Sequence, residues 1–415
     1  MGDLNFKGVY KCEKCGFTVK ENCWITCPEC GGILAFKIDI SAGHTFYTKT
    51  ILKAEKFWDY HPLFPVAHSS AISLGEGNTP LVRLDRLGAK LGVKSLMVKN
   101  EGQNPSGSFK DRCMSLSYTR AVEIGAPATV LASAGNAGAS AAMYAARAGI
   151  PCFLFVPGTI QDARIAQSLM NGARVIKVED GGVTECIELI ASIVGDFDWF
   201  NVTTAAACNP YQAESEKTIA YEIAKSMNYE SPDYVVVPVG GGGCLSGIFQ
   251  GFKDLVDLGL VNKLPRIVAV QDEGCCPLVK AFNDDVDPWD IVKEETVDGV
   301  ALSILDAYPM DGPLALRAIY ESGGIAVAVS AHEIMKAQST LARTEGLLAE
   351  VASSTTIAAL GKLAAKGIVA EEDCVVCVLT GFGYKDLNSL KPDVSPLTVP
   401  FDSNTAKLKI QEYFS

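Results

Sequence analysis

The feature that most constrains the fold is an alternation of short apolar segments with amphipathic segments, from about residue 95 to residue 380. The apolar segments are short and mostly unbroken by polar residues, as is typical of strands covered on both faces of a sheet. Between two of them, Val183, Ile187, Ile190 and Val194 recur with the period of a helix. Alternating strands and helices predict a doubly wound α/β architecture. The expected strands are Ser95–Val98, Thr129–Ala132, Cys152–Val156, Arg174–Val178, Phe200–Val202, Tyr234–Val239, Ile267–Gln271 and Val375–Leu379.

Length and charge narrow the class of protein. A chain of 415 residues is long enough for two or three domains with sizeable cores. Its 36 Lys and Arg residues and 48 Asp and Glu residues give a formal net charge of −12, which disfavours binding to nucleic acid or to an anionic membrane. No apolar run is long enough to span a bilayer, and residues 1–8 lack the apolar core of a signal peptide. These features predict a cytoplasmic protein that acts on a small molecule.

Four cysteines near the amino terminus have the spacing of a metal site. Cys12 and Cys15 form one C-x2-C pair, and eleven residues separate it from a second pair, Cys27 and Cys30. Two such pairs present four thiolates in a tetrahedron, which suits zinc, and four protein ligands predict a closed structural site. A disulfide is the alternative, but a reducing cytoplasm disfavours it. Cys23 lies outside this spacing.

Residues 104–112 read N-P-S-G-S-F-K-D-R and place Lys110 where a strand and a turn give way to a helix. A lysine in a tight, glycine-containing loop is well placed to hold a carbonyl cofactor as a Schiff base. A solvated lysine at a helix start is the alternative interpretation. The run resembles the signature around the cofactor lysine of the threonine synthase family, and G-E-G-N-T-P-L at residues 75–81 resembles a second segment of that family. The resemblance implies that Lys110 carries pyridoxal phosphate (PLP), and many family members have a similar amino-terminal zinc ribbon.

Three further loops follow the ends of expected strands, where open α/β sheets bind ligands. Asn136 lies in a Gly-Asn turn, and the resemblance implies that it holds the phenolic oxygen of the cofactor. The glycines at 240–243 expose N–H groups that can surround a phosphate, and they lack the spacing of a dinucleotide site. Thr380 matches the hydroxyl that the family places at the pyridine nitrogen. The residues expected to bind the cofactor are Phe109, Lys110, Asn136, Gly240, Gly241, Gly242, Gly243, Cys244 and Thr380.

The resemblance covers nearly the whole chain and implies a domain organisation. A zinc ribbon is expected at residues 1–40, a large PLP-binding domain at 41–104 and 201–415, and a small α/β domain at 105–200. Both α/β domains would contain an open, doubly wound sheet, with the cofactor in the cleft between them. Family members are usually dimers, so a homodimer is expected.

The resemblance also implies a lyase that acts on an amino acid. When a substrate amine displaces Lys110 from the cofactor, the freed lysine amine is the natural base for the Cα proton, and Lys110 is therefore the expected catalytic residue. Threonine synthases use O-phosphohomoserine, release phosphate and add water. The expected activity is therefore threonine synthase-like.

The chain departs from the family where a leaving phosphate would need a guanidinium and hydroxyls. Tyr211 and Gln212 replace a histidine and an arginine, Ala134 and Ala137 replace threonines, and Phe382 replaces a histidine. The glycine run also lacks the family's asparagine. These changes leave open a β-eliminating or β-replacing enzyme, such as a serine/threonine dehydratase or a synthase that uses an O-activated amino acid. A regulatory protein without turnover is disfavoured by the cofactor lysine. Other cations that can supply the missing charge are Lys177, Arg164 and Lys217.

Overall fold

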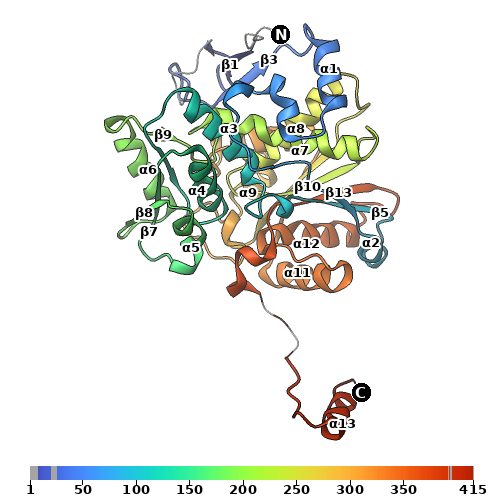
Figure 1. Cartoon of the computed structure of the whole chain (residues 1–415). Helices are drawn as coiled ribbons and strands as arrows, with labels where there is room; N and C mark the ends of the chain where they lie inside the picture. The colour runs from blue at the N-terminus through green and yellow to red at the C-terminus, as the bar shows by residue number, and fades with distance from the viewer. Residues whose placement is uncertain (1–7, 20–25, 391, 393–394, 415) are drawn as a thin grey trace.

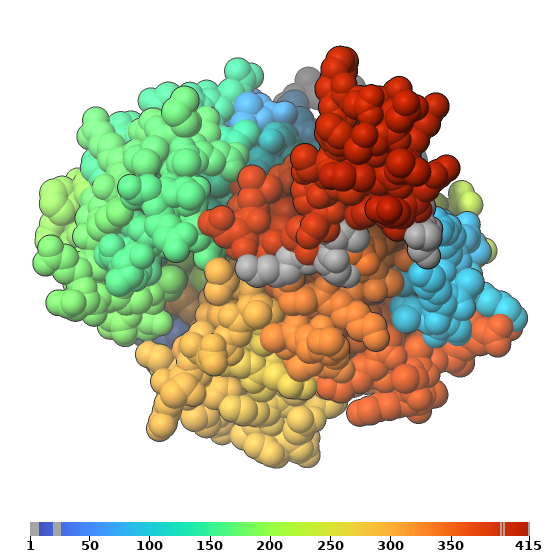
Figure 2. Space-filling view, turned by 90° about the horizontal axis from the view of Figure 1, so that it is seen from below, coloured from blue at the N-terminus to red at the C-terminus, as the bar shows by residue number. Residues whose placement is uncertain are grey.

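The computed structural model of this chain describes residues 8–19, 26–390, 392 and 395–414. In this part of the chain, two open sheets are flanked by helices, and a small antiparallel sheet lies at the amino end (Figure 1). Seen from below, the green segment that forms the smaller open sheet lies to one side of the orange and light-blue segments of the larger one (Figure 2). The predicted α/β class, with two open sheets and an amino-terminal ribbon, is confirmed.

The larger sheet has six strands, which are β4 (Leu81–Arg83), β5 (Ser95–Asn100), β10 (Tyr234–Pro238), β11 (Arg266–Asp272), β12 (Ile325–Val329) and β13 (Cys374–Leu379). Their order is β12-β11-β10-β13-β5-β4, and all neighbours are parallel except the edge pair β4 and β5. Val235 and Val237 of β10 face one hydrophobic core, whereas Tyr234 and Val236 face another. Because both faces are covered, the strands are mostly apolar.

Helices cover the two faces of this sheet. One core includes residues of α7 (Pro210–Ser226), α8 (Gly243–Asp257), α9 (Pro277–Asn283) and α10 (Gly312–Glu321). The opposite core includes residues of α2 (Asp85–Leu91), α11 (Ala331–Glu345) and α12 (Val351–Ala365). The sheet is therefore wound on both sides, as the alternation of strands and helices predicts.

The smaller sheet has four parallel strands, β6 (Thr129–Ala132), β7 (Cys152–Pro157), β8 (Arg174–Val178) and β9 (Phe200–Asn201), in the order β8-β7-β6-β9. Leu131 and Leu154 face a core shared with α3 (Lys110–Glu123), α4 (Asn136–Ala148) and α5 (Asp162–Met170). Val130 and Phe155 face the other side, which α6 (Val183–Ile193) covers. Val183, Ile187 and Ile190 thus lie on a helix, as predicted, whereas Val194 begins the short 3-10 helix η4 (Val194–Asp196).

The amino-terminal ribbon consists of β1 (Gly8–Cys12), β2 (Thr18–Val19) and β3 (Leu34–Ile38), paired antiparallel. After it come α1 (His44–Lys53) and the 3-10 helix η1 (Phe57–Leu63). Phe57 and Trp58 are buried in the same core as α7 and α8. This segment therefore packs into the larger α/β unit.

The carboxyl-terminal helix α13 (Ser403–Phe414) lies away from the body at the end of an extended segment (Figure 1). Most of its described side chains are exposed. None of the helices in the described part of the chain combines the length and the apolar character that crossing a membrane requires.

Every expected strand is present, with ends that differ by at most two residues. Two strands of the larger sheet, β4 and β12, were not expected. The three residues of β4 are too few to show a period in the sequence.

Candidate active site and cysteine cluster

Lys110 is the first residue of α3 and is half-buried. Its Nζ donates a hydrogen bond to the Thr204 hydroxyl at 3.0 Å and lies 4.4 Å from the centre of the Phe109 ring. The Phe109 N–H donates to the Thr380 carbonyl at 3.0 Å. The loop before α3 therefore lies against the carboxyl end of β13, which brings the lysine beside a strand far away in the sequence.

Thr380 and Asn136 both lie beside the loop that follows β13. Thr380 is buried, and its hydroxyl is 3.1 Å from the Ser353 hydroxyl. Asn136 begins α4 and donates Nδ2 to Glu350 Oε2 at 2.7 Å. The Glu350 N–H in turn donates to the Gly381 carbonyl at 3.0 Å. Burial raises the pKa of the Glu350 carboxyl, although Asn136 lowers it.

The glycine loop joins β10 to α8 and has the features of a phosphate cradle. Among the described residues, no acceptor is found for the N–H groups of Gly240 to Cys244. Gly242 has a φ of 100°, which favours glycine, and a Cβ on Gly240 would lie 2.7 Å from an Asp306 oxygen. Free N–H groups at the start of a helix of 15 residues suit a phosphate. The residues present therefore fit a phosphate-bearing cofactor.

Three carboxyl groups lie near this loop and Lys110. Burial raises the pKa of Glu216 to about 7 and that of Asp311 to about 6, and the Lys110 ammonium lowers both. The Asp311 oxygens accept the Ala206 N–H at 2.8 and 3.0 Å. Burial also raises the pKa of Asp306, which lies beside Gly240.

Several polar residues near the predicted site were missed from the sequence. Glu216 gave one signal, because it lies three residues before buried Ile219 and thus on the inner side of α7. The others lie on loops or inside apolar helices, where nothing in the sequence indicates that they meet. The missed residues are Thr204, Glu216, Asp306, Asp311, Glu350, Ser353 and Lys385.

Lys385 is a cation beside the Lys110 loop. Its Nζ donates to the Ser106 carbonyl at 3.0 Å and to Gln167 Oε1 at 2.8 Å. Burial lowers the pKa of this amine, and Glu350 raises it. The hydroxyls of Ser106 and Ser108 are buried and have no partner among the described residues. Lys385 thus lies beside a loop with two buried, unpartnered serine hydroxyls.

The positions that depart from the family contain no replacement guanidinium. Gln212 is fully buried, and neither atom of its amide group has a partner in the described part of the chain. Lys177 lies on the surface and pairs with Asp162 at 2.9 Å. Arg164 lies closer to the predicted site than Lys177 does, since its charge lowers the pKa of Glu350, the partner of Asn136.

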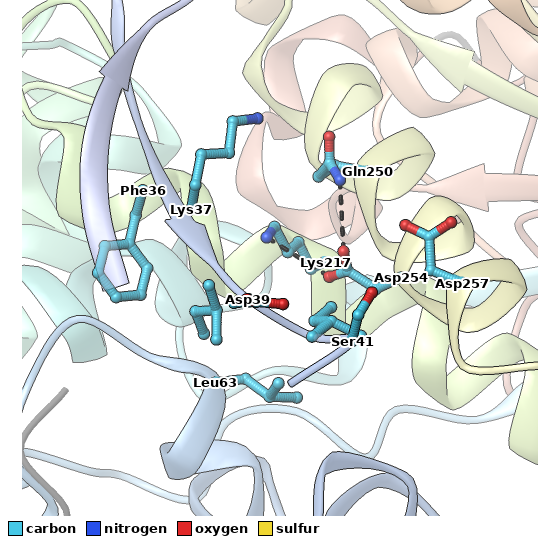
Figure 3. A pocket seen from close by; sticks show the side chains of 11 residues that line it. Phe36, Lys37, Asp39, Ser41, Leu63, Lys217, Gln250, Asp254 and Asp257 are labelled. Carbon is cyan, nitrogen blue, oxygen red and sulfur yellow. Dashed lines mark hydrogen bonds and ion pairs between the residues drawn. The ribbon is translucent and has the colours of Figure 1, made fainter. Parts of the chain in front are cut away.

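Lys217 lines a cavity on the ribbon side of α7. This cavity, about 230 Å³ in volume, lies between β3 and the helices α7 and α8 (Figure 3). The Lys217 ammonium pairs with Glu214 at 2.7 Å and with Asp254 at 3.4 Å. The idea that Lys217 compensates for the missing arginine is therefore wrong, because its charge is already balanced on the ribbon side of α7.

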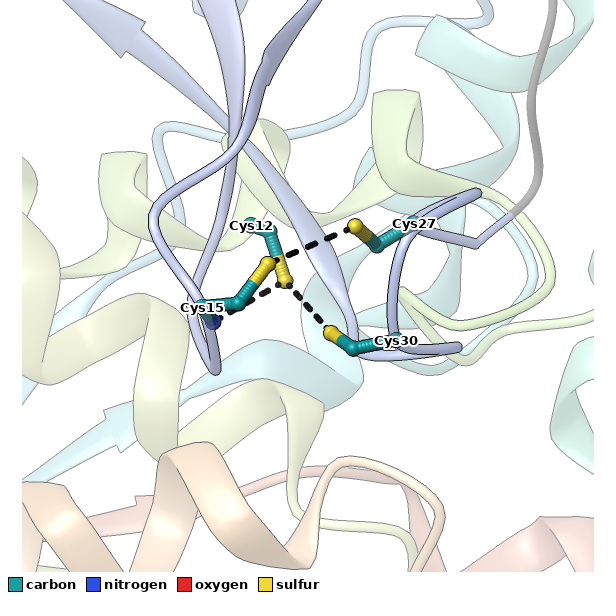
Figure 4. Close-up of side chains that lie close together, drawn as sticks. All are labelled: Cys12, Cys15, Cys27 and Cys30. Carbon is teal, nitrogen blue, oxygen red and sulfur yellow. Dashed lines mark hydrogen bonds between the residues drawn. The ribbon is translucent and has the colours of Figure 1, made fainter.

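The four ribbon cysteines come together as a cluster (Figure 4). Their sulfurs all lie within 4.8 Å of one another, and the pairs Cys12–Cys30 and Cys15–Cys27 are 3.6 Å apart. Sulfurs bound tetrahedrally to one zinc at about 2.3 Å would lie roughly 3.8 Å apart, whereas a disulfide requires about 2.05 Å. The cluster thus fits a metal ion. Cys23 lies outside the described residues.

A family model for pyridoxal-phosphate-dependent enzymes matches residues 72–381. The chain belongs to this family. The threonine synthase of Methanocaldococcus jannaschii is 38% identical over 407 residues, which cover 97% of this chain and 99% of that protein. The threonine synthase of Methanosarcina acetivorans is 38% identical over 378 residues, or 91% of this chain and 92% of that protein. The chain is thus a threonine synthase-like, PLP-dependent lyase, as the resemblance of its motifs implies.

Solved structures of PLP enzymes share the fold. The processed form of threonine deaminase isoform 2 from Solanum lycopersicum has a TM-score of 0.65 at 20% identity, covering 84% of this chain and 92% of that one. Maize serine racemase has a TM-score of 0.65 at 19% identity, covering 81% of this chain and 94% of that one. At such identities the likeness concerns the fold alone.

Proposed function

We propose that this protein converts O-phosphohomoserine and water to threonine and phosphate, using PLP held at Lys110. The observation that carries the proposal is the position of Asn136, the glycine loop and Thr380 at the ends of β6, β10 and β13. The loop that contains Lys110 is bonded to Thr380, and the Lys110 charge acts on Glu216 beside Gly243. The similarity to threonine synthases over nearly the whole chain supports the choice of substrate.

The residues of this chain would divide the work as follows. PLP, when bound, stabilises negative charge on the carbon next to the substrate's amino group. Lys110 Nζ would hold the cofactor and then accept the Cα proton. The N–H groups of Gly240–Cys244 would bind the phosphate of the cofactor, and Asn136 its phenolic oxygen. The Thr380 hydroxyl would face the pyridine nitrogen, where a neutral group favours elimination and replacement over transamination.

Lys385, with the hydroxyls of Ser106 and Ser108, is our candidate for the site of the substrate's phosphate. A cation next to unpartnered hydroxyls is suited to a phosphate oxygen. This group replaces, from another direction, the guanidinium that is absent at Gln212.

Two assays test the proposed function. Purified protein should show the visible absorbance of bound PLP, and Lys110→Ala should abolish it, with Lys94→Ala on the surface as the matched control. The protein should release phosphate from O-phosphohomoserine and form threonine. If no phosphate appears while the cofactor is bound, the choice of substrate is wrong.

A second candidate is a β-eliminating or β-replacing enzyme that acts on serine, threonine or an O-activated amino acid. The buried Gln212 favours it, because a neutral amide stands where the family's guanidinium is expected. Release of keto acid from serine or threonine would identify elimination. Consumption of O-phosphoserine that depends on an added nucleophile would identify replacement.

We further propose that the cysteine cluster binds one structural zinc ion, since four clustered thiolates without an open position suit that role. The proposed domains are residues 1–40, 41–104 with 201–415, and 105–200. Apart from β9, which crosses the boundary at residue 200, the strands of each open sheet fall within one proposed domain. The homodimer and the cytoplasmic location stay predictions.

A further inference from the structure

Glu216 is a buried carboxyl group whose surroundings do little to compensate for its burial. The residue is 1% exposed, and Oε2 has no hydrogen-bond partner among the described residues. Its other oxygen, Oε1, accepts only a weak bond from the Cys113 thiol at 3.3 Å. A carboxylate in such a place costs several kcal/mol unless it is protonated or meets a ligand.

The free oxygen is directed at the glycine loop. Oε2 lies 3.3 Å from the position that a Cβ on Gly243 would occupy, at the first residue of α8. The N–H groups of Gly240–Cys244, which have no acceptors in the described chain, lie at this same helix start. The carboxyl group therefore lies beside a helix start of the kind that binds a phosphate monoester.

The charges around Glu216 set its protonation. Lys110 and the Cys113 thiol face it from α3, Cys244 from α8, and Asp311 from the loop before α10. Other charged groups near α7 are engaged elsewhere: Lys37 of β3 with Glu13, Asp59 of η1 with backbone N–H groups, and Lys217 with Glu214 and Asp254. A phosphate dianion brought to this space would add negative charge and favour the protonated carboxyl.

We propose that Glu216 is protonated when the cofactor is bound and donates its O–H to the cofactor's phosphate, so that binding of PLP takes up a proton at Glu216. The residue is then a positioning residue for the cofactor. The proposal rests on the glycine loop being the phosphate site of the proposed function, and it is independent of which amino acid reacts.

The direction of the pH effect follows from the free protein. The pKa of Glu216 is about 7 without ligand, and a phosphate raises it further. At about pH 8 only about one molecule in ten is therefore protonated before binding, which weakens the apparent affinity about tenfold. This loss of affinity for PLP should increase as the pH rises above 7 and should disappear below it.

Glu216→Gln tests this directly, because glutamine has the same shape and its amide N–H can replace the carboxyl O–H without titrating. PLP is titrated into the full-length chain freed of cofactor, by calorimetry at pH 8 in two buffers of different ionisation enthalpy. The wild type should take up about one proton more per chain than the variant, and the variant should bind PLP up to about tenfold more tightly. At pH 6 the two affinities should agree.

Controls separate this proton from others. Pyridoxal, which lacks the phosphate, should show no difference in proton uptake between wild type and Glu216→Gln. Inorganic phosphate should reproduce the difference. Glu214→Gln, a neighbouring buried carboxyl that pairs with Lys217, should behave as wild type in proton uptake. An infrared difference spectrum of the wild type at pH 8 should show a protonated carboxyl group gained with PLP, whether or not the variant folds.

Equal proton uptake in wild type and Glu216→Gln would overturn the proposal. So would a variant that binds PLP more weakly at every pH, or an infrared spectrum without a gained carboxyl band. If PLP binds as expected but O-phosphohomoserine releases no phosphate, only the proposed reaction fails and the proton uptake still decides this inference. If no PLP binds at all, both fail.

Discussion

Arg112→Met tests whether a buried ion cluster holds the helix that begins at Lys110. Arg112 is fully buried and donates to both oxygens of Glu101, at 2.8 and 2.9 Å, and to both oxygens of Glu222, at 2.6 and 2.7 Å. Lys99 donates to the same Glu222 at 2.6 Å, so that two cations balance two carboxylates. Methionine keeps much of the side-chain volume and removes one cation.

The expected loss in the free energy of unfolding can be worked out in two ways. Removing one partner of a buried pair typically costs about 3–5 kcal/mol, because the remaining charge is left uncompensated. Burial raises the pKa of Glu222, but Arg112 and Lys99 outweigh it and lower the pKa from 4.5 to about 2. That difference corresponds to about 3 kcal/mol of stability, which Arg112 shares with Lys99. We therefore expect Arg112→Met to lower the free energy of unfolding by about 3–5 kcal/mol.

Urea unfolding of the full-length chain at neutral pH, followed by circular dichroism, measures this loss. Arg83→Met is the matched control, because Arg83 is exposed and contacts exposed Asp85 and the Lys94 carbonyl, so a much smaller loss is expected. In Arg112→Met, the carboxyl groups that lose their partner have a raised folded-state pKa. The difference in the free energy of unfolding between variant and wild type should therefore shrink as the pH falls from about 8 to about 5. In the wild type, the contribution of Glu222 is present above pH 4.5 and is lost as the pH falls towards 2. A loss below about 1 kcal/mol, or a deficit independent of pH, refutes the reasoning.

Three further predictions concern other parts of the molecule. Gly274→Ala should lower the urea midpoint severely, because its Cβ would lie 1.1 Å from the Asp298 carbonyl oxygen, whereas Gly361→Ala in α12 should change stability by no more than about 1 kcal/mol. About one zinc per chain should be found by elemental analysis. A chelator or Cys27→Ser should release the zinc and lower the melting temperature. A wild-type melting temperature that the chelator leaves unchanged contradicts the zinc site. Lys385→Met should raise KM for a phosphorylated substrate about tenfold or more and leave PLP absorbance intact, and an unchanged KM would exclude Lys385 from the phosphate site.

The sequence alone predicts the parts of this protein that depend on neighbouring residues. Strands buried on both faces appear as short apolar runs, and glycines mark the loop between β10 and α8 because a φ of 100° at Gly242 excludes other residues. The C-x2-C pairs predict the cysteine cluster because two short loops suffice to gather four sulfurs. Lys110, the glycine loop and the end of the final strand each lie in a short motif, and the order of these motifs along the chain indicates the cofactor family.

Only the tertiary structure decides which distant polar groups meet. Glu216 faces the glycine loop while its neighbour Lys217 faces the ribbon, because successive helical residues point about 100° apart and α7 is packed on both sides. Lys385 reaches the Lys110 loop only because β13 lies in the centre of the sheet, beside β5, whose end leads into that loop. Protonation of a carboxyl group depends on burial and on charges brought from other elements, and the spacing of residues along a chain contains neither.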